Sequence, residues 1–258
     1  MKARTGIPDE AGRICGLFAV DIAGFCGPER DDDVLLYLHA ALYQMLERAF
    51  DGSGVPWRAC VHEDRGDGVL VVVPATLPAA GLVDPLLERL RGLLRRHNRL
   101  SSPAAAIQLR AACHIGQVHR DAHGFVGAAV NHLFQLLDAP PLKRLLTTAG
   151  TELAFIASDY VYQTVIRPHP TLVDPDVFAA LTVEVKQTTS LGWVHLPGAV
   201  PFGADGWPAV SGEAAHRSDG RGGLTVVRLG GRPARVAPRG RPPGIPPRQT
   251  PATSSRRI

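Results

Sequence analysis

Residues 17–25, LFAVDIAGF, form an apolar run that holds a single charged side chain, Asp21. Such a run predicts a strand over residues 14–22 that ends before the glycine at position 24. A carboxylate in an apolar strand is costly to bury unless it is paired or coordinates a cation. Asp21 is therefore the first candidate functional residue, and a helix cap or a loop position is the plainer interpretation.

A second carboxylate, Asp67, sits in the glycine-rich turn RGDG at residues 65–68. The turn joins two predicted strands, 55–62 and 69–73, into a hairpin. If the first strand lies beside this hairpin, Asp21 and Asp67 point at one place. Two carboxylates with open water positions suit Mg²⁺ or Mn²⁺ bound to a nucleoside triphosphate. The alternative for Asp67 is an ordinary Asp-Gly turn.

Helices and hairpins are mixed along the rest of the chain. Helices are predicted over residues 31–50, 82–100 and 159–165, and the segment 125–137 begins extended and becomes a helix that runs on towards 146. Strands are predicted over 107–118, 153–156, 181–186 and 192–196. The opening order βαββαβ is the ferredoxin-like unit in a variant form. An all-parallel doubly wound sheet would not contain these hairpins. We therefore predict an α+β fold, one mostly antiparallel sheet with helices packed on one face.

Three sequence blocks together resemble a known family. They are FAVDIAGF at 18–25, EDRGDGVLV at 63–71 and LRAACHIGQVHRDAHGFVGAAVNHLFQLL at 109–137, and residues 183–197 resemble the same family's last hairpin. The family is that of the class III nucleotidyl cyclases, the adenylate and guanylate cyclases, here in a divergent bacterial-type form. The resemblance covers residues 14–197 and implies a cyclase-like domain over that range.

The resemblance implies roles for individual residues. Asp21 and Asp67 align with the carboxylates that hold two divalent ions, Mg²⁺ or Mn²⁺, while Asn131 aligns with the asparagine that orients the ribose. In the family, the ribose 3′-oxygen attacks the α-phosphorus and pyrophosphate leaves. Lys186 lies where a phosphate-binding lysine often stands. The expected lining of the substrate site consists of Ile22, Gly24, Phe25, Arg65 and Gly66.

The family's site forms between two protomers, with the metal aspartates from one and the asparagine from the other. The resemblance therefore implies a homodimer. One departure bears on activity: Gln135 stands four residues after Asn131, where the family has an arginine. Glutamine donates a hydrogen bond but carries no charge and makes no bidentate guanidinium contact. Losing such a group typically costs orders of magnitude in rate.

Of the two positions that contact the base in this family, only one carries a suitable side chain here. Glu63 falls where guanylate cyclases carry glutamate, and a carboxylate there accepts hydrogen bonds from guanine. Gly124 falls at or near the second base-reading position and has no side chain for the purpose. Guanine is favoured, and a pyrimidine triphosphate stays open as the substrate.

Two functions follow from these residues. The first is an enzyme that converts a nucleoside triphosphate into a 3′,5′-cyclic nucleotide and pyrophosphate at a homodimer interface. The second is a catalytically degenerate relative, a regulatory or nucleotide-binding dimerisation module, which Gln135 and Gly124 favour.

Residues 201–258 differ in composition from the rest of the 258-residue chain. They contain ten arginines, no lysine and three acidic residues, so they carry a net charge of +7 and leave −3 for residues 1–200. Nine prolines and ten glycines predict a disordered tail. An acidic partner is a candidate ligand for this tail, and nucleic-acid binding is the less favoured interpretation because aromatic residues are not interleaved.

Location is predicted from composition as well. The four cysteines form no CxxC pair, which suits free thiols in a reduced cytoplasm. The sequence holds no apolar run long enough to span a bilayer and opens without the pattern of a signal peptide. We therefore expect a cytoplasmic protein that does not associate with a membrane.

Overall fold

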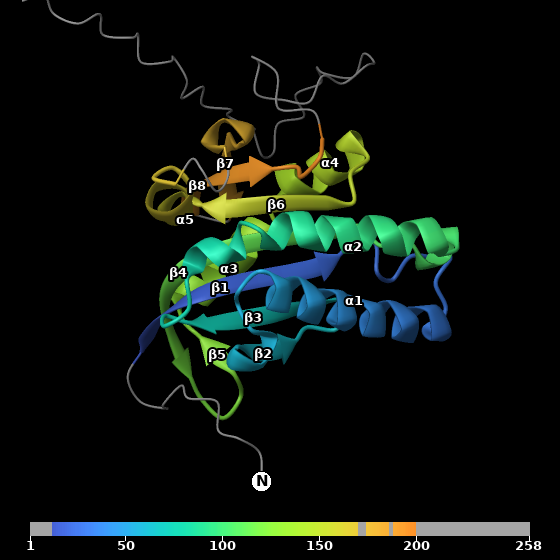
Figure 1. Ribbon diagram of the computed structural model, residues 1–258, viewed down its shortest axis with the longest axis horizontal. Helices are drawn as coiled ribbons and strands as arrows, with labels where there is room; N and C mark the ends of the chain where they lie inside the picture. Colours follow the sequence, from blue (N-terminus) through green and yellow to red (C-terminus); the bar gives the residue numbers. More distant parts are fainter. Residues whose placement is uncertain (1–11, 170–173, 186–187, 200–258) are drawn as a thin grey trace, which may run out of the picture. The chain divides into compact units, whose positions relative to one another are not determined.

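The computed structural model describes residues 12–169, 174–185 and 188–199, all within the unit Met1–Arg228. Their strands form one eight-stranded sheet in the order β2-β3-β1-β4-β6-β8-β7, with β5 paired to β4 (Figure 1). The strands are β1 (Arg13–Ile22), β2 (Val61–Asp64), β3 (Gly68–Pro74), β4 (Leu109–Arg120), β5 (Phe125–Val126), β6 (Leu153–Ser158), β7 (Ala179–Val185) and β8 (Thr188–His195). Among the strands of these described residues, only the β4–β6 pair is parallel. The predicted α+β class with a mostly antiparallel sheet is confirmed.

The first six main elements reproduce the ferredoxin-like unit. Their order is β1, α1, β2, β3, α2, β4, and β1 pairs antiparallel with both β3 and β4. The helices are α1 (Asp32–Gly52), α2 (Leu86–Leu100), α3 (Ala128–Leu137), α4 (Pro140–Ala149) and α5 (Asp159–Val161). Short helical turns complete the described chain: η1 (Trp57–Ala59), η2 (Ala79–Leu82), η3 (Pro103–Ala105), the π-helical η4 (Tyr162–Ile166) and η5 (Pro175–Val177).

Helices cover both faces of the sheet, so the prediction of a single covered face is wrong. Phe18 and Val20 of β1 belong to the core that α1 and α2 complete, whereas Leu17 and Ala19 belong to the core that α3 and α4 complete. Alternate residues of a strand point to opposite faces. A strand covered on both sides therefore reads as a continuous apolar run, and residues 15–20 are such a run.

Local signals explain where individual elements begin. Asp31 caps α1, its Oδ1 accepting a hydrogen bond from the Val34 amide at 2.9 Å. The predicted continuation of α3 towards residue 146 is interrupted, because Pro140 starts the separate helix α4. The predicted strand over 55–62 is mostly the turn and 3₁₀ helix η1, and β2 begins only at Val61.

Two predictions lie outside the described residues. They are the disordered tail at 201–258 and the phosphate-binding role of Lys186. Among the helices that the structure does describe, none is long and apolar enough to cross a membrane.

Candidate active site

Asp21 is the next-to-last residue of β1, and its exposed fraction is 7%. Its carboxylate forms an ion pair with Arg110 of β4. The Arg110 Nε and Nη2 atoms each donate to one carboxylate oxygen of Asp21 at 2.7 Å. This bidentate, charge-assisted pair satisfies both oxygens of a buried carboxylate. Burial nevertheless raises the pKa of Asp21 to about 6, against the opposing effect of Arg110, and the nearby Asp67 charge adds to the rise.

Asp67 is held beside Asp21 by the backbone. The Ile22 amide donates to the Asp67 carbonyl at 2.9 Å, and Asp21 pairs with Gly68 across β1 and β3. A Cβ at position 68 would lie 2.1 Å from the Val20 carbonyl oxygen, so only glycine permits this close approach. The backbone therefore places Asp67 beside the end of β1 that carries Asp21, close enough for its charge to act on the Asp21 carboxylate.

Helix α1 fixes the turn that carries Asp67. Asp64 accepts hydrogen bonds from His39 Nε2 at 2.6 Å and from the Tyr43 hydroxyl at 2.9 Å. Its other oxygen accepts from the Gly66 amide at 2.7 Å, and Gly66 adopts φ +81°. The hydrogen bonds from Gly66, His39 and Tyr43 lower the pKa of Asp64 below its usual value and outweigh the opposing effect of burial.

The two predicted base-reading positions lie against each other. Glu63 Oε1 accepts from the Phe125 amide at 2.7 Å, and Oε2 accepts from Arg65 Nη2 at 2.8 Å. A Cβ at Gly124, which has φ +136°, would lie 2.2 Å from Glu63 Oε1. The missing side chain at position 124 thus makes room for the Glu63 carboxylate. Each carboxylate oxygen keeps a second lone pair for a further donor.

The side chain of Arg30 holds the loop 23–30, which follows β1, in place through hydrogen bonds. Arg30 donates to the Gly24 carbonyl at 2.9 Å and to the carbonyls of Ala104 and Ala106 at 3.0 and 2.8 Å. Gly24 has φ +63°, and Phe25 packs, half-buried, against the α1–α2 core. The predicted lining residues Gly24 and Phe25 are therefore held in place, next to the buried Ile22.

Helix α3 carries two of the predicted catalytic residues, Asn131 and Gln135. Asn131 is exposed, and half-buried Gln135 hydrogen-bonds His132. The His132 ring lies edge-on to His114 with 4.8 Å between ring centroids, and His114 Nδ1 lies 2.8 Å from Ser158 Oγ. Burial, reinforced by His132, lowers the pKa of His114 to about 4, so this ring is neutral at pH 7.

Arg65 joins the turn that carries Asp67 to α3 of the same chain. Its guanidinium lies 4.9 Å from the centroid of the Phe134 ring on α3, a cation–π contact. The turn bearing Asp67 therefore touches the helix bearing Asn131 and Gln135.

The carboxylates suit a divalent cation. The described residues hold no group of three or more His, Cys, Asp and Glu side chains arranged for a metal. A nucleotide-bound Mg²⁺ needs only one or two carboxylates, since phosphates and water complete its octahedron. The oxygen donors of Asp21 and Asp67 fit this requirement once the Arg110 guanidinium releases Asp21.

Sequence reasoning missed four residues of this site. Arg110 reads as a polar position within a strand, and its pairing with Asp21 depends on the sheet register, in which the two are directly opposite. His39, Tyr43 and Asp64 meet only because α1 packs beside β2. For Arg110 alone there was a signal, because a charged residue in an apolar strand suggests a partner for a buried carboxylate.

Comparison with known proteins identifies the fold. No family model and no curated protein matches the sequence. An adenylate/guanylate cyclase/hydrolase from Silicibacter pomeroyi is similar in structure, with a TM-score of 0.52, 20% identity and coverage of 73% of this chain and 99% of its own. The chain has the fold of a cyclase catalytic domain. A guanylyl cyclase gives the same TM-score at 16% identity, covering 74% of this chain and 96% of its own.

Proposed function

We propose that this protein is a class III-type nucleotidyl cyclase, which converts a nucleoside triphosphate into a 3′,5′-cyclic nucleotide and pyrophosphate. One observation carries the proposal: in a cyclase fold, the backbone holds Asp67, in the turn before β3, beside Asp21 near the end of β1, and Arg110 pairs with Asp21. A purely structural ion pair would need only one of the two carboxylates.

Asp21 and Asp67 would hold the divalent cations, Mg²⁺ or Mn²⁺, whose charge would favour ionisation of the ribose hydroxyl and offset the charge on the phosphates. Arg110 holds Asp21 in the absence of substrate. A guanidinium freed from that pair presents a planar fork of donors that matches phosphate oxygens. Arg110 thus protects the buried carboxylate when the site is empty and binds the triphosphate when it is filled.

The α3 residues complete the site from a second protomer. Asn131 is exposed, as a residue that reaches a substrate held by a partner must be. Gln135 replaces the family's arginine with a neutral donor, and its hydrogen bond to His132 orients the amide. We expect slower turnover than in a cyclase with arginine there, because charge developing on the phosphate is less well stabilised.

Glu63 favours guanine as the base. Its carboxylate is held by the Phe125 amide and by Arg65, and its remaining lone pairs can accept from the guanine N1 and N2 donors. Gly124 contributes only backbone, so a pyrimidine triphosphate stays a second candidate.

The test is incubation of the purified full chain with ATP, GTP, CTP and UTP in separate reactions with Mn²⁺, followed by mass spectrometry. We expect a cyclic monophosphate, most of all from GTP, that disappears in Asp67→Asn. Arg58→Gln, an exposed change on η1, is the matched control and should leave the product unchanged. No product from any triphosphate, with a folded dimer, would contradict the proposal.

A degenerate module is the second candidate, favoured by a specific observation. Both oxygens of Asp21 are bonded to Arg110, and Gln135 lacks the family's charge. This candidate predicts nucleotide binding or dimerisation without pyrophosphate release. Equilibrium binding of a non-hydrolysable triphosphate together with a pyrophosphate assay separates the two functions.

A further inference from the structure

Glu63 and Arg65 point to the same side of the chain at the end of β2. Alternate residues of an extended segment point to opposite faces. Asp64, between them, is held by two side chains of α1. Glu63 instead accepts a hydrogen bond from the Phe125 amide, and Arg65 lies over the Phe134 ring of α3. Both side chains therefore face the layer that contains α3.

The two side chains form an ion pair that a ligand can reach. Arg65 Nη2 donates to Glu63 Oε2 at 2.8 Å, and the Arg65 and Glu63 side chains are 40% and 21% exposed. Among the residues that the structure describes, the Arg65 guanidinium makes no other hydrogen bond. A guanidinium carries several N–H donors, and each carboxylate oxygen keeps a lone pair. An acceptor and a donor therefore stand side by side.

Gly124 leaves the task of a second base contact to another residue. Glu63 occupies the space that a side chain at position 124 would take, since a Cβ there would lie 2.2 Å from Glu63 Oε1. The Phe125 amide has a single N–H, and it already donates to that oxygen. Of the two groups that donate to Glu63, only Arg65 has further donors to offer a base.

We propose that Glu63 and Arg65 together select bases that carry a lactam, an N–H next to a C=O, and that Arg65 bonds the C=O. This inference rests on the proposed function and names the substrate class of its site. Glu63 would accept from the ring N–H, and Arg65 would donate to O6 of guanine or O4 of uracil. Arginine is a common partner of guanine O6 in nucleic-acid recognition.

Adenine and cytosine present the opposite pattern at the same edge. Each has an amino group in place of the C=O and an unprotonated ring nitrogen in place of the N–H. Donor would then face donor at Arg65, and acceptor would face acceptor at Glu63, so polar groups would lose water without gaining a partner. Within one ring size, guanine should therefore bind more tightly than adenine, and uracil more tightly than cytosine.

The test is isothermal titration calorimetry of the full chain with the α,β-methylene analogues of GTP, ATP, UTP and CTP, each with Mg²⁺. These analogues cannot release pyrophosphate, so affinity is measured without turnover. The guanine analogue should bind about tenfold or more tightly than the adenine analogue, and the uracil analogue likewise against the cytosine analogue. In Arg65→Met both ratios should fall about threefold or more, because only the lactam bases lose a hydrogen bond.

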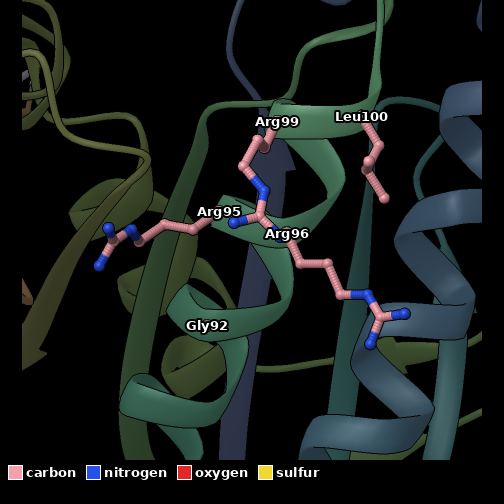
Figure 2. A pocket seen from close by; sticks show the side chains of 5 residues that line it. All are labelled: Gly92, Arg95, Arg96, Arg99 and Leu100. Atoms are coloured by element: carbon pink, nitrogen blue, oxygen red, sulfur yellow. The ribbon is translucent and has the colours of Figure 1, made fainter.

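Two further variants serve as controls. Arg99→Met changes an exposed arginine of α2, which covers the opposite face of the sheet from α3, and it should keep both ratios. Figure 2 shows Arg99 beside a hollow of about 420 Å³ on that helix. Arg65→Lys keeps a cationic donor and should hold both ratios closer to those of the unaltered chain. A merely structural role for Arg65 would change the affinity for all four analogues alike.

The possible failures are distinguishable. Equal affinities for guanine and adenine and for uracil and cytosine, or ratios unchanged in Arg65→Met, would overturn the lactam preference and leave a nucleotide site in place. Binding of none of the four analogues by the unaltered chain would overturn the proposed function together with this inference.

Discussion

The two halves of the candidate active site differ in how firmly the chain itself fixes them. On the carboxylate side, Asp21, Asp64 and Glu63 each accept at least two hydrogen bonds from the protein. On the α3 side, Asn131 is exposed and Gln135 is oriented by the His132 side chain. The difference teaches that one chain fixes the side chains of Asp21, Asp64 and Glu63 and holds Asp67 through its backbone. The α3 half leaves Asn131 exposed, as the proposed site shared between two protomers requires.

The largest expected effect comes from breaking the pair between Asp21 and Arg110. Asp21→Ala leaves a buried guanidinium without its partner and should lower the free energy of unfolding by about 3–5 kcal/mol. Asp21→Leu/Arg110→Met removes both charges and should recover most of that stability while abolishing cyclase activity. Denaturant unfolding measures the first effect, and a double variant as unstable as Asp21→Ala would contradict this account.

The next largest effect is expected where β1 and β3 approach closely at Gly68. Gly68→Ala places a Cβ 2.1 Å from the Val20 carbonyl oxygen, so β1 and β3 must separate at the carboxylates. We expect a loss of about 2–3 kcal/mol in unfolding free energy. Gly92→Ala is the matched control on α2, where the added Cβ meets open space and should stabilise the helix by up to about 1 kcal/mol. Similar losses in both variants would refute the close approach at Gly68.

Protonation of His114, which lies on β4 against His132 of α3, tests the α3 side of the site. Because the pKa of His114 in the folded protein is about 4, below its usual 6.5, the neutral ring contributes stability that is present above pH 6.5. That stability is lost as the pH falls through 4, by about 2 kcal/mol after solvent screening. His114→Gln should flatten the stability profile between pH 6.5 and 4, as measured by thermal unfolding. An unchanged slope would show that other groups cause the acid sensitivity.

The α3 side also offers a gain of function. Gln135→Arg restores the charge that the cyclase resemblance expects and should raise the rate of cyclic nucleotide formation about tenfold. The control is Gln163→Arg, an exposed glutamine of η4. Equal rates in all three proteins would mean that position 135 does not contact the reacting phosphate.

The smallest expected effect on stability comes from a change beside the turn at residues 65–68, which carries Asp67. Tyr43→Phe removes one of the two α1 donors to Asp64 and should cost about 1 kcal/mol of stability. It should also weaken Mn²⁺–nucleotide binding more than Tyr160→Phe, an exposed tyrosine distant in sequence from the turn. Identical nucleotide affinity in both variants would show that α1 does not position Asp67.

The sequence was sufficient for features that depend on neighbouring residues. The capped start of α1, the glycine turn at 65–68 and the strand character of β1 all follow from short patterns. A charged residue within an apolar strand marks Arg110 as a candidate partner for a buried carboxylate, but its pairing with Asp21 depends on the sheet register, which joins residues 89 positions apart. The second helical layer was missed, although the unbroken apolar run in β1 is the pattern of a strand covered on both faces.

The most direct test of the central claim mixes two inactive variants. Asp67→Asn removes a carboxylate, and Asn131→Ala removes the ribose contact, so each homodimer alone should produce no cyclic nucleotide. Random exchange makes half of the dimers mixed, and each mixed dimer has one intact site, so the mixture should recover about a quarter of the unaltered protein's rate. A mixture as inactive as its two parts, alongside an active unaltered protein and demonstrated subunit exchange, would contradict a site shared between protomers.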